Sequence, residues 1–331
     1  MTIEEVARSF TTLSRDRPDR FDAMADVVLS YQRSHNPVYS RYCTALSPRR
    51  GSLPTFLPVA AFKQSRVAAF PSGEEDAVFE SSRTGSGVPS RHFVRDLSLY
   101  DAAAAVHFEQ VFGGRPFVFA SYLPRYAEAG EASSLLYMVE MLQDRFGADG
   151  SGSVLGDVSR LSGLADRSRR EGRPLLVFGA AFGLLDVVER RTFELPETAL
   201  VIETGGMKTH RREIDRVELH RRLAEGFGLE RSAIRSEYGM CELLSQCYTR
   251  GDNRFVPPPW MRTWIVDPAA PFEELEEGEV GALAVLDLAN VYTASALLTE
   301  DRAVRRGKGF EILGRLSGAE LRGCNFLLEH V

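Results

Sequence analysis

The sequence predicts an α/β fold, in which a mainly parallel sheet is layered with helices and is followed by a small barrel-like β subregion. Between residues 117 and 235, short apolar runs typical of buried strands alternate with longer runs of helical periodicity. This alternation is typical of a parallel sheet, because parallel strands need helical crossovers between them. After Pro257, Pro258 and Pro259, strand-like runs follow one another with few helices between them. We therefore expect an α/β core over residues 1–255 and a β-rich subregion of the same domain over residues 256–331.

Helices are expected where apolar residues recur at intervals of three and four. The first is expected over residues 3–35, because the apolar periodicity continues until Pro37 ends the run. Asp101 can cap a second helix that continues to about Phe112, since a carboxylate accepts hydrogen bonds from first-turn N–H groups. Three more helices are expected over residues 133–146, 182–190 and 216–227.

Strands are expected where short apolar runs are bounded by turn residues. The clearest is residues 175–179, because a continuous apolar run is typical of a strand buried on both faces. Further strands of the α/β core are expected to end at residue 79 and to cover residues 117–120, 199–202 and 233–235. In the β-rich subregion, strands are expected over residues 263–266, 281–288, 293–298 and 310–313.

The composition argues against several classes of protein. The formal net charge is -6, so a basic surface for nucleic acid is not expected. Arginine clusters at residues 167–173 and 211–222 are interpreted as solvated helix faces, because acidic residues lie among or beside them. No apolar stretch reaches the roughly 18 residues of a membrane helix, and the acidic N-terminus lacks a signal core. The spacing of the four cysteines does not fit a zinc site, so we expect a reduced, cytoplasmic setting without a membrane partner.

A loop of small and hydroxyl-bearing residues runs from Ser81 to Gly87. Small residues let the backbone approach phosphate oxygens, and hydroxyls together with successive N–H groups can bind an anion. The loop lacks the Gly-Lys-Ser/Thr ending of a Walker loop. The alternative is an ordinary loop, which is what most Ser/Gly-rich stretches are.

Three further motifs carry residues suited to a nucleotide. Residues 204–208 follow a predicted strand, where open α/β sheets bind ligands, although a tight turn that uses the positive φ of glycine fits as well. In residues 236–242, Tyr238 can stack on a base and Glu242 can hold Mg²⁺, the alternative being the first turn of a helix. Residues 299–301 with 314–315 supply a carboxylate and an arginine, the alternative being a surface salt bridge.

Taken together and in this order, these four motifs resemble those of the adenylate-forming enzymes. More narrowly, the chain resembles the LuxE-type acyl-protein synthetases, which are relatives of phenylacetate–CoA ligase. The resemblance implies the large domain of an adenylate-forming enzyme and the ATP- and Mg²⁺-dependent activation of a carboxylic acid. In that reaction a carboxylate oxygen attacks the α-phosphate, which gives an acyl-adenylate and pyrophosphate. The likeness covers nearly the whole chain, through segments 56–58, 79–82, 89–92, 203–208, 236–246, 258–262 and 322–324.

The resemblance also implies roles for individual residues by match to the family motifs. Glu242 would ligate Mg²⁺, and Asp301 would bind the ribose hydroxyls with Arg315 nearby. The residues implied to hold the ATP phosphates are Ser81, Ser82, Thr84, Gly85 and Ser86. The other residues implied to bind the nucleotide are Gly205, Gly206 and Tyr238 around the adenine, together with Gly239 and Cys241.

Three departures from the family pattern bear on activity. Arg83 stands at the first glycine of the family's loop, so it either adds a phosphate contact or obstructs the loop. Cys241 replaces the usual threonine and loses a hydroxyl donor. We also expect the chain to lack the mobile small domain that carries a catalytic lysine in larger relatives. Lys208, His92 or Arg91 is expected to supply the missing positive charge, with Lys208 first because its loop should face the nucleotide; its alternative is an exposed turn lysine.

Cys324 raises the question of the acyl acceptor. The resemblance implies an acyl-carrying cysteine near the C-terminus, whose thiolate would attack the mixed anhydride and leave a thioester. Arg322 is close enough in sequence to lower the pKa of that thiol. The alternative is a buried structural cysteine, which the apolar run over residues 326–328 favours.

Two hypotheses for the acyl acceptor and one rival hypothesis for the function follow from these residues. The acyl group passes either to a protein thiol, Cys324 included, or to a small amine, alcohol or thiol. The rival hypothesis is a catalytically degenerate nucleotide-binding protein or a subunit that depends on a partner protein. Arg83, Cys241 and the missing small domain motivate this rival.

Overall fold

The computed structural model describes residues 1–331 with the exception of residues 47–50, 82–87, 131, 191–192, 206–213 and 318–331. The chain folds into two compact units. The first unit comprises Met1–Val106, Met240–Gln246 and Val256–Val331, and the second comprises His107–Gly239 and Cys247–Phe255. The chain therefore leaves the first unit after Val106 and returns to it twice.

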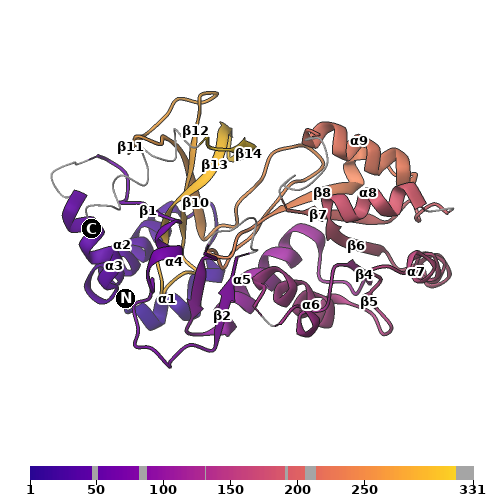
Figure 1. Ribbon diagram of the computed structural model, residues 1–331, viewed down its shortest axis with the longest axis horizontal. Helices are drawn as coiled ribbons and strands as arrows, with labels where there is room; N and C mark the ends of the chain where they lie inside the picture. The colour runs from indigo at the N-terminus through magenta and orange to yellow at the C-terminus, as the bar shows by residue number, and fades with distance from the viewer. Residues whose placement is uncertain (47–50, 82–87, 131, 191–192, 206–213, 318–331) are drawn as a thin grey trace. The chain divides into compact units, whose positions relative to one another are not determined.

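The first unit is built on a mainly antiparallel sheet (Figure 1). Its strand order is β1-β13-β12-β10-β11, with β14 paired to β13, and only the short β1 runs parallel to its neighbour. The β-rich character expected after the three prolines is therefore present, whereas the domain boundary at residue 255 stays a prediction. The strands are β1 (Leu57–Pro58), β10 (Met261–Asp267), β11 (Ala270–Glu274), β12 (Val280–Asp287), β13 (Ala296–Arg306) and β14 (Gly309–Arg315).

The helices at the start of the first unit differ from the single helix expected over residues 3–35. A capping box between Thr2 and Glu5 begins the first helix, and a 3-10 turn and an irregular stretch follow it. Pro37 begins a helix instead of ending one, because proline lacks only an N–H that the first turn does not use. The elements are α1 (Ile3–Ser9), η1 (Phe10–Thr12), α2 (Pro18–His35), α3 (Pro37–Leu46), α4 (Ala61–Gln64), β2 (Ala77–Glu80), β3 (Arg91–Val94) and the N-terminal part of α5 (Leu97–Phe112).

The second unit is built on a sheet of order β5-β4-β6-β7-β8-β9. All pairs are parallel except the last, in which the short β9 runs antiparallel to β8. The α/β fold with a mainly parallel sheet is thereby confirmed. The strands are β4 (Val118–Tyr122), β5 (Gly152–Ser153), β6 (Leu175–Ala180), β7 (Leu200–Thr204), β8 (Ile234–Tyr238) and β9 (Cys247–Tyr248). The other elements are η2 (Ala127–Ala129), α6 (Ser134–Phe146), α7 (Val158–Glu171), α8 (Ala181–Arg190), α9 (Arg216–Phe227) and η3 (Arg231–Ala233).

Helices cover both faces of this parallel sheet (Figure 1). Side chains of α7, α8 and α9 form one apolar cluster with alternate residues of the strands, among them Val118, Ala120 and Val177. The opposite face is covered by α6, whose start is capped by the Ser133 hydroxyl. Because β4 to β8 are parallel, their carboxyl ends lie along one edge, which is where open α/β sheets bind ligands.

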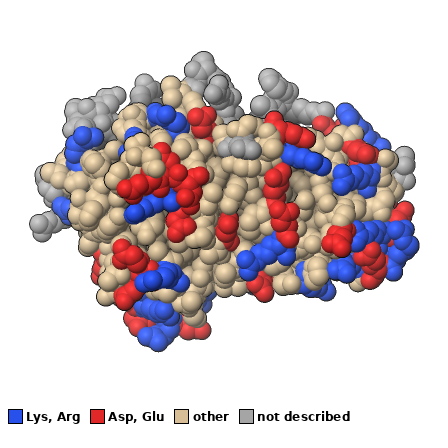
Figure 2. All heavy atoms as spheres, turned by 90° about the horizontal axis from the view of Figure 1, so that it is seen from below, with Lys and Arg blue, Asp and Glu red and all other residues tan. Residues whose placement is uncertain are grey.

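Charged side chains of both signs are interleaved on the face shown in Figure 2. On α9, Arg221 pairs with Glu218 and Glu225, and on α7, Arg167 pairs with Glu171. The described parts of the two arginine clusters are therefore helix faces with acidic neighbours, as predicted. Among the residues that the structure describes, no helix is long and apolar enough to cross a membrane.

Candidate functional site

The structure describes ten of the predicted site residues. Seven others lie outside the described residues, namely Ser82, Thr84, Gly85, Ser86, Gly206, Lys208 and Cys324. The first unit contains Ser81, Arg91, His92, Cys241, Glu242, Asp301 and Arg315, and the second contains Gly205, Tyr238 and Gly239.

The segment 240–246, which carries Cys241 and Glu242, has its backbone bound by buried side chains of the first unit. The Cys241 carbonyl lies 2.7 Å from Nδ1 of His92. The Glu242 carbonyl accepts a hydrogen bond of 2.8 Å from Nδ2 of Asn290. The Leu244 N–H donates to Oδ1 of the same asparagine at 3.0 Å. The path of this segment is therefore set by side chains distant in sequence, and the alternative of a helix start at 236–242 is wrong.

Asp287, at the end of β12, also binds the segment 240–246. Its carboxylate accepts hydrogen bonds from the Ser245 hydroxyl at 2.7 Å, the Ala289 N–H at 3.0 Å and the Leu244 N–H at 3.3 Å. The indole N–H of the fully buried Trp260 donates to the Ser245 oxygen at 2.9 Å. Burial raises the pKa of the Asp287 carboxyl to about 6. Hydrogen bonds from neutral donors therefore hold this buried carboxylate.

Helix α2 binds the turn that carries Asn290. Gln32 is fully buried, and its Nε2 donates to the carbonyls of Asn290 and Val291 at 2.7 and 2.9 Å. Its Oε1 accepts from the Ser295 N–H at 2.9 Å. A chain of buried polar contacts thus connects α2, the turn after β12 and the segment 240–246.

His92 is uncharged at neutral pH, which corrects its expected role as a source of positive charge. Burial lowers the pKa of this fully buried imidazole to about 4. The Cys241 carbonyl can only accept, so Nδ1 carries the proton, and Nε2 accepts from the Thr293 hydroxyl 3.1 Å away. Both ring nitrogens are therefore used within the protein, and His92 positions the backbone of the segment 240–246.

The Glu242 carboxyl is buried, and burial raises its pKa above the ordinary range. Lys63 and Arg315 oppose this rise through their positive charge. Burial also raises the pKa of the adjacent Cys241 thiol, so this cysteine is a thiol and not a thiolate at neutral pH. Among the described residues, no group of three or more His, Cys, Asp or Glu side chains is arranged to hold a metal ion.

Asp301 and Arg315 lie opposite each other on the paired strands β13 and β14. Nε of Arg315 lies 3.0 Å from Oδ1 of Asp301, and its Nη1 lies 3.8 Å from Oε2 of Glu300. Nζ of Lys63 lies 3.9 Å from Oε1 of Glu300. Asp301 is buried, whereas the Arg315 side chain is 45% exposed, so the pair lies at the protein surface with its carboxylate turned inward. Two carboxylates and two cations are therefore gathered at this end of the sheet.

Ser81 and Arg91 lie on the hairpin of β2 and β3. The Ser81 hydroxyl accepts a hydrogen bond of 2.9 Å from the Ser90 N–H, and the Ser81 N–H donates to the Ser90 carbonyl at 3.0 Å. These bonds close the two ends of the loop that runs from Ser81 to Ser90. The exposed Arg91 guanidinium lies 5.6 Å from the ring centre of Phe93.

In the second unit, a buried polar cluster joins the ends of β7 and β8. The Ser236 hydroxyl donates to the carboxylate of Glu203 and accepts from Nε2 of His220, which lies 2.9 Å away. Nε2 of His220 is also 3.4 Å from the Glu203 carboxylate, and Nε of Arg216 is 3.6 Å from it. These contacts join side chains to side chains, whereas His92 and Asn290 bind backbone groups of the segment 240–246.

Glu237 and Tyr238 lie within β8, whereas the sequence placed them after a strand. The Thr204 hydroxyl donates to the buried Glu237 carboxylate, and burial, with the charge of Glu203, raises the pKa of Glu237 to about 7. Tyr238 packs on Phe255, with ring centres 5.6 Å apart. Gly205 directly follows β7 with a φ of 91°, a conformation that favours glycine.

The comparisons with known proteins identify the family. A family described as "Acyl-protein synthetase, LuxE" matches residues 155–331, which is more than half of the chain. The chain belongs to the LuxE family of acyl-protein synthetases. This confirms the family that the motifs resemble and, with it, the expected class of enzyme, an acyl-adenylate-forming ligase. The comparison with curated proteins finds no match.

Solved structures show the fold. 2-Hydroxyisobutyryl-CoA ligase in complex with 2-HIB-AMP and CoA is 15% identical with a TM-score of 0.63, over 92% of this chain and 76% of that one. ATP-bound MatB from Rhodopseudomonas palustris is 17% identical with a TM-score of 0.54, over 74% of this chain and 49% of that one. The amide bond synthetase McbA from Marinactinospora thermotolerans is 16% identical with a TM-score of 0.50, over 76% of this chain and 49% of that one. The predicted large-domain fold of adenylate-forming ligases is thereby confirmed.

Sequence reasoning missed the buried residues that bind the segment 240–246 of this LuxE-family chain. Asp287 and Asn290 follow the apolar run of β12, so a carboxylate and an amide at the end of a buried strand were the available signal. Gln32 offered a signal of the same kind, because it is a polar residue on the apolar face of α2. None of these signals indicates which backbone groups the side chains bind.

Proposed function

We propose that this chain uses ATP and Mg²⁺ to activate a carboxylic acid as an acyl-adenylate with release of pyrophosphate, and then passes the acyl group to a nucleophile. The observation that carries the proposal is the bound backbone of the segment 240–246, which fixes the position of the buried Glu242. Catalysis of adenylation depends mainly on positioning and on neutralising charge, so a fixed carboxylate suits it.

Glu242 fits the role of a Mg²⁺ ligand by its chemistry. Its carboxyl is buried, its pKa is raised by burial, and no salt bridge to it is present within the described residues. A divalent cation would restore the ionised form of such a group. Mg²⁺ supplies neutralisation of phosphate charge and orientation of the phosphate oxygens. The other predicted phosphate contacts are the hydroxyls and N–H groups of Ser81 and the loop after it.

Asp301 fits the role of a ribose ligand by its chemistry, because a carboxylate accepts hydrogen bonds from hydroxyl donors. Arg315 holds one of its oxygens at 3.0 Å and so orients the carboxylate. Gly205, Tyr238 and Gly239 are proposed to border the adenine. MatB was solved with ATP bound and 2-hydroxyisobutyryl-CoA ligase with 2-HIB-AMP, which supports a nucleotide and an acyl-adenylate by analogy of fold.

The positive charge for the phosphates is proposed to come from Lys208, with Arg91 as the second candidate. Lys63 adds a cation that the motif-based candidates did not include, and Arg315, expected beside the ribose, is a further one. Both lower the pKa of Glu242. The protein's part in the reaction is then to hold the acid, the nucleotide and these charges in place while the carboxylate attacks.

The acceptor is proposed to be a protein thiol or a small nucleophile, and a protein acceptor is in keeping with the acyl-protein synthetase family. Cys324 is the candidate within the chain, and a protein thiol or a small amine, alcohol or thiol is the candidate outside it. The Cys241 thiol is excluded as the nucleophile, because burial raises its pKa and keeps it protonated.

ATP–pyrophosphate exchange with Mg²⁺, over a panel of fatty, aryl and amino acids, tests the proposal. Exchange with one class of acid is expected, and it would identify the substrate class at once. A Cys324→Ala variant that still turns over would show that this cysteine is no obligatory carrier. Absence of exchange with every acid would instead favour the nucleotide-binding protein or the partner-dependent subunit, a rival consistent with the buried thiol of Cys241 at the position of a family threonine.

A further inference from the structure

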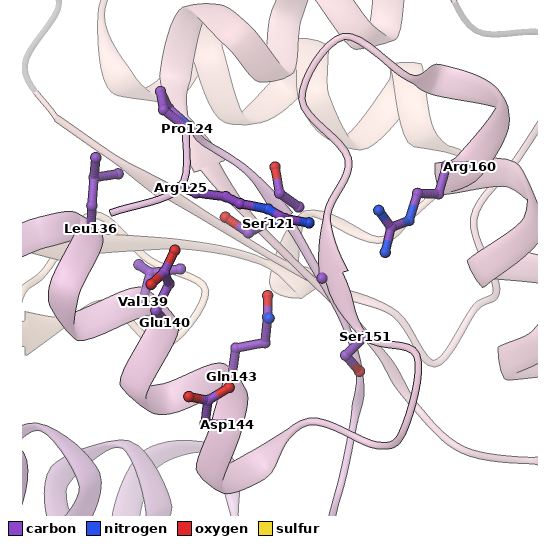
Figure 3. A pocket seen from close by; sticks show the side chains of 12 residues that line it. Ser121, Pro124, Arg125, Leu136, Val139, Glu140, Gln143, Asp144, Ser151 and Arg160 are labelled. Carbon is purple, nitrogen blue, oxygen red and sulfur yellow. The ribbon is translucent and has the colours of Figure 1, made fainter. Parts of the chain in front are cut away.

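A cavity of about 210 Å³ opens in the second unit, between α6, α7 and the ends of β4 and β5 (Figure 3). Within this sheet β4 is separated from β7 by β6 alone, so the two strands lie about 10 Å apart. None of the residues that line the cavity belongs to the motifs assigned to the nucleotide. The cavity is therefore a second feature of the same ligand-binding edge.

Two arginines converge on this cavity. Arg125 follows β4 and Arg160 lies in the first turn of α7, and their guanidinium groups point toward each other across the space (Figure 3). Neither guanidinium has a hydrogen-bond or ion-pair partner among the described residues. Arg160 reaches the floor of the cavity at Gly152, where an added Cβ would stand only 2.8 Å from Nη2. Two unpaired positive charges in one small cavity create a site that favours an anion.

Neutral donors complete the lining. Ser121 is only 5% exposed, lines the cavity, and its hydroxyl has no partner among the described residues. The Ser151 oxygen accepts from the Phe119 N–H at 2.9 Å, which leaves its own O–H free to donate. The amide of Gln143 extends from α6 toward the same space (Figure 3). Hydroxyl and amide donors beside guanidinium groups match the oxygens of a carboxylate or a phosphate.

Two acidic residues of α6 also line the cavity, and their positions are compatible with an anion. Oε1 of Glu140 accepts a hydrogen bond of 2.7 Å from the Tyr126 N–H, so this carboxylate holds the turn that carries Arg125. Asp144 is exposed and lies in the last turn of α6. Neither carboxylate lies within ion-pair distance of Arg125 or Arg160 in the described structure. The arginines therefore remain available to an added ligand.

We propose that this cavity binds the anionic end of a reactant, a carboxylate or phosphate group, between Arg125 and Arg160. The group is carried either by the far end of the acid to be activated or by the acyl acceptor. The assignment to a reactant rests on the proposed adenylation, whereas the anion site itself does not.

The first experiment measures the site without any turnover. Inorganic phosphate and malonate are titrated into the full chain, and the rise in thermal stability is followed, since a ligand that binds only the folded state stabilises it. Arg125→Gln and Arg160→Gln are expected to weaken the apparent affinity about tenfold each, because each removes charge-assisted hydrogen bonds. Arg170→Gln, an exposed arginine of α7 outside the cavity, and Glu242→Gln are expected to leave the affinity unchanged. Binding that is absent, or that is lost in Glu242→Gln and kept in the cavity variants, would overturn the proposal.

The second experiment identifies the source of the anion. Pyrophosphate exchange is compared for monocarboxylic and dicarboxylic acids of equal length, in the wild type, Arg125→Gln and Arg160→Gln. If the acid carries the anion, the wild type prefers the dicarboxylic acid and the variants lose about tenfold of that preference. If the acceptor carries it, the preference is absent, and the KM of a phosphorylated thiol acceptor rises about tenfold in the variants instead. If exchange occurs but neither the preference for dicarboxylic acids nor the KM of the acceptor changes in the variants, the assignment to a reactant is refuted. If the wild type shows no exchange, the adenylation is refuted, whereas the anion binding measured in the first experiment is unaffected.

Discussion

The two units hold their candidate site residues by different means. In the first unit, His92, Asn290 and Asp287 bind backbone groups of the segment 240–246. In the second, Glu203 and Glu237 are bound by hydroxyls, an imidazole and a guanidinium at the ends of β7 and β8. Backbone contacts fix the path of the chain whatever side chain it carries. Side-chain contacts instead depend on which two side chains are present.

Removal of the Asp287 carboxylate should have the largest effect. Asp287→Ala leaves the Ser245 hydroxyl and the Ala289 N–H without their acceptor, whereas the Leu244 N–H keeps its bond to Asn290. Each buried donor left unpaired costs about 1–3 kcal/mol. We expect the free energy of unfolding to fall by about 4 kcal/mol, measured by chemical denaturation. Asp26→Ala, on the exposed side of α2, serves as the control and should stay within about 0.5 kcal/mol. A loss as small as the control's would show that Asp287 does not bind the segment 240–246.

His92 should make the first unit sensitive to acid. The folded-state pKa of about 4 lies below the ordinary histidine value of 6.5, so the stability that His92 contributes is fully present above pH 6.5 and is lost as pH falls toward 4. The expected loss is on the order of 3 kcal/mol between these limits. In His92→Gln this part of the pH dependence should vanish in denaturation curves recorded from pH 4 to 8. If the variant lost as much stability as the wild type between pH 6.5 and pH 4, the result would contradict a neutral, buried His92.

Glu237 should give the second unit the opposite pH dependence, with stability that falls as pH rises. Its folded-state pKa of about 7 lies above the ordinary glutamate value of 4.5, so its contribution to stability is fully present below pH 4.5 and is lost as pH rises toward 7. Glu237→Gln keeps an acceptor for the Thr204 hydroxyl without the charge. The variant should exceed the wild type in stability at pH 8, by about 2 kcal/mol, and match it at pH 4.5. A variant less stable than the wild type at pH 8 would mean that Glu237 is stabilised as a carboxylate.

Cys241→Thr should have the smallest effect on stability. It tests directly whether a contact to the backbone is independent of the side chain at that position. His92 binds the carbonyl of Cys241 and not its thiol, so the contact survives a change of side chain. We expect the free energy of unfolding to change by less than about 1 kcal/mol, and pyrophosphate exchange to rise as the hydroxyl donor of the family pattern is restored. Cys43→Thr, at another buried cysteine of the first unit, gives the matched control for burial of a hydroxyl.

Much of the fold follows from the sequence, because local patterns determine it. The continuous apolar run of β6 predicts a strand buried on both faces, and that strand lies in the middle of the parallel sheet. The start of α6 was predicted at Ser133, which caps it through its hydroxyl. Pro37 misled the prediction because a proline at a helix start and a proline after a helix end look the same in a sequence.

The site follows from the sequence only in part. Family motifs indicate Glu242 and Asp301, and cross-strand pairing brings Asp301 and Arg315 together as implied. The protonation state of His92 was not predictable, because it depends on burial by residues far away in the chain. The convergence of Arg125 and Arg160 was not predictable either, since it depends on how α7 approaches the end of β4.

The role of Glu242 in adenylation is tested most directly by comparing ATP–pyrophosphate exchange in the wild type, Glu242→Gln and Glu197→Gln, at a temperature at which all three proteins are folded. Glu197 is exposed and serves as the control for loss of one carboxylate. With an acid that the wild type accepts, Glu242→Gln should lose about 100-fold of the exchange rate, while Glu197→Gln keeps it. Exchange by Glu242→Gln at the wild-type rate would contradict the account, because the bound segment 240–246 would then position a carboxylate that the reaction does not use.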